Sequence, residues 1–133
     1  TFGIGATSPM PTSTRQGVFS EAQATEGAQL YAVRCAMCHG KALEGTYETP
    51  ALQTRFLANW SKLPLSDLFD YLEHAMPQFA PGSLKPDENA KIIAHILKSN
   101  AMPAGPQALS AERGALKRIL IEPVSAKAVP KTK

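Results

Sequence analysis

The sequence predicts an all-α fold, and two observations carry this prediction. Segments 20–35, 66–74 and 86–100 repeat apolar residues at the 3–4-residue spacing of a helix. No segment reads convincingly as a strand, and Gly- and Pro-rich loops separate the helical segments. The length of 133 residues indicates one domain. Aromatic residues make up only 7% of the chain, so a small core short of large side chains gains from burying a bulky apolar cofactor.

The first predicted helix spans residues 20–35. Ser20 and Gln23 have the spacing of a capping box, which marks a helix start. Gly27, Leu30 and Tyr31 then fall on one face at helical spacing. This face leads Cys35 toward the core.

Three further helices are expected. In the second, residues 66–74, Ser66 is the predicted N-cap, and Leu68, Tyr71 and Leu72 face inward. In the third, residues 86–100, Pro86 takes the first helical position, and acidic residues follow it in the first turn. The fourth, residues 111–121, has a weaker pattern.

Composition divides the chain into three parts. Residues 1–19 are rich in Gly, Pro, Ser and Thr and predict an irregular N-terminal arm. Residues 20–108 form the expected domain, and residues 109–133 a basic extension whose last residues we expect to be disordered or draped on the surface. No basic stripe interleaved with aromatic residues points to nucleic acid, and no apolar run approaches the roughly 18 residues that span a bilayer. Because the chain starts at Thr1, we expect that a signal peptide has been removed.

The only two cysteines stand in "RCAMCHG", where Cys35, Cys38 and His39 have C-x-x-C-H spacing. A disulfide here would close a very small loop and add little stability. A thioredoxin-like pair should follow a strand and open a helix, whereas this pair ends one. Zinc would need two more ligands, and His74 and His95 lie far downstream and far apart. Covalent haem attachment is the reading that C-x-x-C-H favours, with both thiols bonded to the macrocycle and His39 on the iron.

Residues 20–110 resemble the class I c-type cytochromes. The resemblance rests on the spacing G-x3-aromatic-x3-C-x-x-C-H, on "IIAHIL", and on Gly27, Tyr31, Cys35, Cys38, His39, Pro50, Trp60, Met76 and Pro77. It implies a cytochrome c fold of three to five helices around one haem c, bound covalently through Cys35 and Cys38. It also implies that the first and last helices cross, with Gly27 permitting their close approach and Tyr31 packing at the crossing.

Methionine is the usual partner of histidine on the iron of electron carriers, and Met76 is the best candidate for the sixth ligand beside His39. It follows a predicted helix and precedes a loop stiffened by prolines. His74 is a weaker candidate, which we expect at an exposed helix end. The resemblance implies two supporting roles: the backbone carbonyl of Pro50 accepts the second ring N–H of His39, and the indole of Trp60 donates to a haem propionate. Plain core packing is the alternative for Trp60.

The expected function is one-electron transfer without substrate chemistry, so we expect no enzyme activity. "LYAVRCAMCHGKALEG", "DYLEHAMPQFAPGSL" and "ILKSNAMPAG" resemble cytochromes, or cytochrome domains, that serve alcohol dehydrogenases with a quinone cofactor (PQQ). We therefore expect a monomeric carrier in the bacterial periplasm, with a dehydrogenase as donor and a terminal oxidase or another cytochrome as acceptor. Two alternatives stay open. One is a fixed haem subunit of a dehydrogenase, clasped by the arm and the tail; the other is a haem enzyme or gas-binding protein whose Met76 dissociates.

Overall fold

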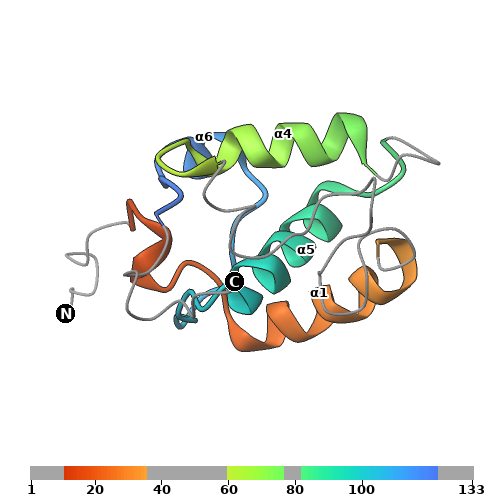
Figure 1. Ribbon diagram of the computed structural model, residues 1–133, viewed down its shortest axis with the longest axis horizontal. Coiled ribbons are helices and arrows are strands. Elements are labelled where there is room, and N and C mark those ends of the chain that lie inside the picture. Colours follow the sequence, from red (N-terminus) through yellow and green to blue (C-terminus); the bar gives the residue numbers. More distant parts are fainter. Residues whose placement is uncertain (1–10, 36–59, 77–81, 123–133) are drawn as a thin grey trace, which may run out of the picture.

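The computed structural model describes residues 11–35, 60–76 and 82–122, and these ranges are helical (Figure 1). They hold four α-helices, α1 (Glu21–Arg34), α4 (Leu65–Ala75), α5 (Pro86–Ser99) and α6 (Arg113–Lys117), and the short 3-10 helix η2 (Thr14–Gln16). Within these ranges, extended pairing is limited to isolated bridges. The predicted all-α fold class is therefore confirmed. No helix among the described residues is long and apolar enough to cross a bilayer.

Helix α1 begins as the sequence predicts but is capped differently. The hydroxyl of Ser20 accepts a hydrogen bond from the Gln23 N–H (3.1 Å). The side chain of Gln23 does not return this bond: its Nε2 donates to the Leu109 carbonyl (3.0 Å), and its Oε1 accepts from the Leu109 N–H (2.7 Å). The expected capping box is thus only half formed. Its other half is replaced by a buried link between α1 and the segment that follows α5.

The crossing of α1 and α5 confirms the close approach expected at Gly27. A Cβ added to Gly27 would lie 1.8 Å from the backbone oxygen of Lys91, far inside any possible contact distance. One turn further on, the rings of Tyr31 and His95 pack with centroids 5.2 Å apart and planes tilted by 52°. Glycine is required here because only a residue without a side chain lets the two backbones meet.

Helix α5 has the predicted bounds because its signals are local. Pro86 occupies the first turn, where the missing N–H removes no hydrogen bond. The carboxylate of Glu88 accepts from the Lys85 N–H (2.8 Å) and so caps the helix start. At the other end, the side-chain amide of Asn100 donates to the Ile96 carbonyl (2.7 Å).

Helix α4 corrects two expectations. Its N-cap is Pro64, not Ser66, and no side chain caps it. Instead, the Leu65 N–H donates to the carbonyl of Ile119 (2.8 Å), so a distant segment supplies the hydrogen-bond acceptor for the first N–H of the helix. Ser66 lies inside the helix and is buried. Leu68 faces inward as expected, but Tyr71 does not, since it is 45% exposed.

Helix α6 is shorter than the predicted span of 111–121. It ends at Lys117, and the residues that follow pair in extended form with two distant segments. The Leu120 N–H donates to the Thr12 carbonyl (2.9 Å), and the Ile121 N–H donates to the Leu63 carbonyl (2.8 Å). These backbone bonds replace the last turns of the expected helix.

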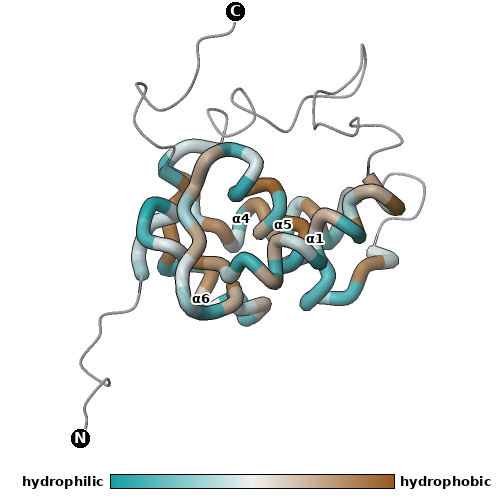
Figure 2. The backbone as a smooth tube through the Cα atoms, turned by 90° about the horizontal axis from the view of Figure 1, so that it is seen from below, coloured by the Kyte–Doolittle hydropathy of each residue, from teal (hydrophilic) through white to brown (hydrophobic). Residues whose placement is uncertain are grey.

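The buried residues form two clusters. The main cluster joins α1, α4, α5 and α6 to the segments before α1 and after α5, and Trp60 and Leu72 pack against it. It consists of Val18, Phe19, Ala24, Leu65, Leu68, Phe69, Ala90, Ile93, Ala94, Leu97, Met102, Leu109, Leu116, Ile119 and Ile121. The cysteine-side cluster consists of Tyr31, Leu84, Ile92 and Ile96, with Leu30 and Cys35 packed against it. Figure 2 shows the apolar stretches of α4 and α5 in the middle of the molecule.

The described parts of the predicted arm and extension contribute residues to the main cluster. Val18 and Phe19 are buried before α1, and Leu109, Leu116 and Ile121 are buried after α5. The hydroxyl of Thr14 also accepts from the Glu122 N–H (2.9 Å), so the two ends of the described chain meet. The boundaries at residues 19 and 108 stay predictions.

Candidate haem site

Cys35 is the member of the C-x-x-C-H motif that the structure describes. It is the C-cap of α1, and its N–H donates to the Tyr31 carbonyl (2.8 Å). Its side chain is half-buried and packs against the cysteine-side cluster. The helix therefore holds the first thiol against an apolar wall, as a thioether anchor requires. Cys38, His39 and Pro50 lie outside the described residues.

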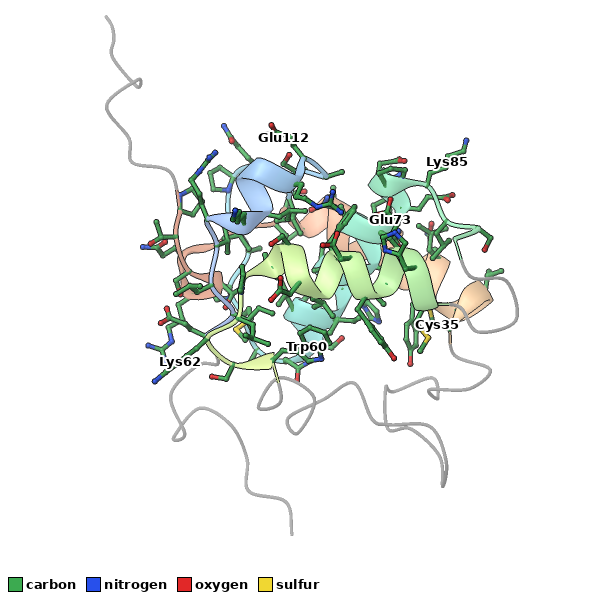
Figure 3. All side chains as sticks on the ribbon, turned by 90° about the horizontal axis from the view of Figure 1, so that it is seen from above. Cys35, Trp60, Lys62, Glu73, Lys85 and Glu112 are labelled. Atoms are coloured by element: carbon green, nitrogen blue, oxygen red, sulfur yellow. The ribbon has the colours of Figure 1, made fainter. Side chains whose placement is uncertain are left out.

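Met76 is the C-cap of α4, and its N–H donates to the Leu72 carbonyl (3.2 Å). The residue is half-buried, and its backbone has turned from helical to extended (φ −125°, ψ 149°). The C-terminal ends of α1 and α4 lie at the same end of the molecule in Figures 1 and 3. The predicted anchor Cys35 and the predicted ligand Met76 are thus brought to one end by two helices far apart in the sequence.

Trp60 lies before α4 and projects on the same side of the molecule as Cys35 (Figure 3). It is half-buried against the main cluster, and its ring packs on Tyr71 with centroids 5.8 Å apart and planes tilted by 55°. This packing anchors the indole at the cluster surface. Its role toward a propionate stays a prediction.

The histidines of the described residues take structural positions. His74 is exposed in the last turn of α4, where its Nδ1 lies 2.9 Å from the Asp70 carbonyl. His95 is half-buried against Tyr31 at the α1–α5 crossing. The pKa of His95 is lowered from 6.5, first because burial disfavours the imidazolium and second because of the charge of Lys98.

The described residues fit a large apolar group that is attached at Cys35. The two clusters supply separate apolar surfaces: Cys35 packs on one, and Trp60 and Leu72 pack on the other. Thiol, thioether and imidazole are also the donor groups of c-type haem sites. Haem c would be held by Cys35 and Cys38, with His39 and Met76 as the ligands expected on its iron.

Asn89 of α5 is a buried polar residue that the sequence analysis did not single out. Its side chain is fully buried, and both its amide nitrogen and its amide oxygen lack a hydrogen-bond partner in the structure. An unpaired buried amide costs about 1–3 kcal/mol, so such a group calls for a partner. The signal was present, because Asn89 interrupts the apolar face that Ile92, Ile93 and Ile96 continue.

Comparison with known proteins identifies the family. The family model described as "Cytochrome C oxidase, cbb3-type, subunit III" matches residues 22–96, which run from the start of α1 into α5. No curated protein sequence gives a significant match. Among solved structures, the chain is similar to the sulfane dehydrogenase SoxCD from Paracoccus pantotrophus, with a TM-score of 0.55 and 19% identity. That match covers 90% of this chain and 67% of the other and shows a shared fold.

The family match spans both helices of the Gly27 crossing and the whole C-x-x-C-H motif. It covers more than half of the chain, which is enough to assign the family. Proteins of this kind carry covalently bound haem c and transfer electrons. The chain therefore belongs to the family of the cbb3-type subunit III cytochromes and is a class I c-type cytochrome with covalently bound haem c.

Proposed function

We propose that this protein is a one-electron carrier of the bacterial periplasm, which accepts electrons from a dehydrogenase and passes them toward a terminal oxidase. The position of Cys35 and Met76 at one end of the molecule supports the proposal, because one haem could be attached to Cys35 and bound by Met76 there. Resemblance to the cytochromes of PQQ-dependent alcohol dehydrogenases suggests such an enzyme as donor. Export to the periplasm is expected because covalent haem attachment takes place outside the cytoplasm.

The side chains of the site have two tasks: they would hold the haem, and they would exclude water from it. When bound, haem c supplies an iron that cycles between the ferric and ferrous states. Leu84, Ile92 and Ile96 present apolar surface that keeps water away and so favours the state of lower charge. Met76 would be a ligand of the iron, and a bound thioether would keep substrates and small ligands off the metal. The site is therefore suited to electron transfer rather than to bond-making chemistry.

A free carrier is favoured over a fixed subunit by the packing of the chain ends. The arm (1–19) and the tail (109–133) were candidates to clasp a partner. In their described parts, 11–19 and 109–122, the buried apolar side chains belong instead to the main cluster: Val18, Phe19, Leu109, Leu116, Ile119 and Ile121. These apolar side chains are therefore buried within this chain and are not exposed to bind a partner. The remaining residues of the arm and the tail lie outside the described ranges.

The ligand assignment is tested by visible spectroscopy of Met76→Leu. Parent protein in the ferric state should show the weak long-wavelength iron–sulfur band, and sharp split bands on reduction. Met76→Leu should lose the iron–sulfur band and bind carbon monoxide rapidly when reduced. Met102→Leu is the matched control, since Met102 is buried in the main cluster and a Leu of similar volume fits there. A band that survives in Met76→Leu would assign the ligand to another residue.

The donor is tested with a purified PQQ-dependent alcohol dehydrogenase and an alcohol. A free carrier is reduced at a rate that rises with its own concentration, and it elutes alone in gel filtration. Stable co-elution with the dehydrogenase would instead establish the fixed-subunit alternative. No reduction by the dehydrogenase, in protein that dithionite reduces normally, would exclude this class of donor.

A further inference from the structure

Asn89 differs from the other buried polar side chains of the described residues. Gln23 and Thr14 are hydrogen-bonded to backbone groups of distant segments, and Asn100 is hydrogen-bonded to the Ile96 carbonyl of its own helix. Asn89 is as fully buried as Thr14, yet neither of its polar atoms has a partner. Buried polar groups of folded proteins are nearly always hydrogen-bonded. We therefore look for the partner of Asn89 in the group that the site binds or in a residue that holds this group.

The position of Asn89 on α5 places it between the two clusters. Ile92 and Ile96, three and seven residues further on, belong to the cysteine-side cluster. Ile93, four residues further on, belongs to the main cluster. Residues at these spacings lie along one face of a helix. Asn89 therefore lies on α5 between the residues of the two clusters.

The position of Asn89 along α5 indicates whether it lies near Met76 or near Trp60. Helix α5 starts at the end of the molecule where α1 and α4 finish, and Met76 is the last-turn cap of α4 (Figure 1). Trp60, the residue expected near a propionate, lies before the start of α4 at a distance from Cys35 (Figure 3). Asn89, in the first half of α5, is thus at the Met76 end of the site. Thioether sulfur and backbone carbonyl oxygen, the groups of Met76, both accept hydrogen bonds.

We propose that Asn89 is a positioning residue for the axial ligand: its carboxamide donates a hydrogen bond at the Met76 end of the site and restrains Met76 on the iron. This inference rests on the proposed function, because it takes Met76 as the ligand. A purely structural role makes a different prediction. An amide that only supports the fold would change stability when removed, and would leave the hold on Met76 unchanged.

Competition with imidazole measures how strongly Met76 is bound to the iron. Ferric protein is titrated with imidazole, which displaces Met76, and loss of the iron–sulfur band gives an apparent dissociation constant. The variants are Asn89→Leu, which removes the donor at similar volume, and Asn89→Thr, which keeps a hydroxyl donor. Gln23→Leu is the control, because it also removes a buried hydrogen-bonding side chain but lies at the far end of α1. Reduction potentials are recorded for the same set.

Asn89→Leu is expected to bind imidazole roughly three- to tenfold more tightly than the parent, the ratio that corresponds to one lost hydrogen bond. Its reduction potential should fall, because a donor near the ligand sulfur favours the electron-rich ferrous state. Asn89→Thr should have an imidazole affinity and a reduction potential between those of the parent and Asn89→Leu. Gln23→Leu should match the parent in both measurements, although its free energy of unfolding is lower.

Equal imidazole affinities and potentials in the parent and Asn89→Leu would overturn the inference and leave the carrier proposal intact. Should Asn89→Leu fail to fold with haem, Asn89→Ala, which also removes the donor, is compared with the parent and decides in the same way. Absence of the iron–sulfur band from the parent itself would overturn both proposals, because Met76 would then not be the ligand.

Discussion

Gly27 and Gly114 both stand within helices, and their surroundings make them opposite cases. At Gly27 the nearest atom to an added Cβ is a backbone oxygen of α5 at 1.8 Å, which cannot move without separating the helices. At Gly114 the nearest atom is a carboxylate oxygen of the flexible Glu112 side chain at 3.5 Å, an ordinary contact. The same substitution therefore probes backbone contact at one site and helix propensity at the other.

Gly27→Ala should lower the free energy of unfolding by about 1–3 kcal/mol or more, because α1 and α5 must move apart. Gly114→Ala should leave it unchanged or raise it by up to about 1 kcal/mol, since alanine loses less entropy in a helix. Urea unfolding of both variants measures the difference. Equal effects of the two substitutions would show that α1 and α5 do not make backbone contact in solution.

His95 should make stability depend on pH. The folded state holds its pKa below 6.5, so in the window below about pH 6.5 the unfolded chain binds the proton more readily. The free energy of unfolding should therefore fall as the pH drops from about 7.5 toward 5.5, and the loss should level off below the folded pKa.

Urea midpoints across this pH range test the prediction in the parent, in His95→Gln and in the control His74→Gln. His95→Gln should flatten the pH dependence. His74→Gln should keep it, because His74 is exposed at the end of α4. A parent and a His95→Gln variant with the same slope would assign the pH dependence to other groups.

The attachment of α1 to the rest of the molecule depends on one buried side chain more than on its surface charges. Gln23 satisfies both backbone groups of Leu109, whereas Lys98 pairs with Glu21 (2.6 Å) at an exposed site. A buried group that loses its partner keeps the full cost of desolvation, while an exposed ion pair is replaced by water. The internal link therefore outweighs the visible salt bridge.

Gln23→Leu should lower the free energy of unfolding by about 1–3 kcal/mol, because the Leu109 N–H and carbonyl are left unpaired. Lys98→Ala is the comparison and should change it little. Chemical denaturation of the haem-loaded variants provides the measurement. A larger effect of Lys98→Ala would mean that surface electrostatics, and not the buried link, holds α1 in place.

At the scale of the whole molecule, the segment after α5 contributes several side chains to the main cluster. Leu109, Leu116, Ile119 and Ile121 all lie in the main cluster, and each fully buried side chain of this kind contributes about 1.5–3 kcal/mol. Their sum is on the order of the whole stability of a small domain.

A chain that ends at residue 108 should therefore fail to fold cooperatively, whereas one that ends at residue 122 should melt as the parent does. Thermal unfolding followed by circular dichroism distinguishes the two. A shorter chain with the parent's melting temperature would place the domain boundary at 108, as the composition predicts.

Local signals in the sequence account for the elements that were predicted correctly. Pro86 and the acidic first turn of α5 act on neighbouring backbone groups, so their effect can be read without knowing the fold. The same holds for the C-x-x-C-H motif, whose chemistry depends on a spacing of five residues. The failed predictions at Ser66 and at residues 118–121 share one cause: backbone bonds from distant segments replaced the local ones.

For the site, the sequence was sufficient to nominate Cys35, Trp60 and Met76, because each residue type has a defined task around a haem. It could not show that α1 and α4 end at one end of the molecule, or that Asn89 is buried without a partner between two clusters. Helical period and motif spacing describe contacts over a few residues. Which faces meet, and which polar group is left unpaired, depend on contacts between segments far apart in the chain, and those arise only when the helices pack.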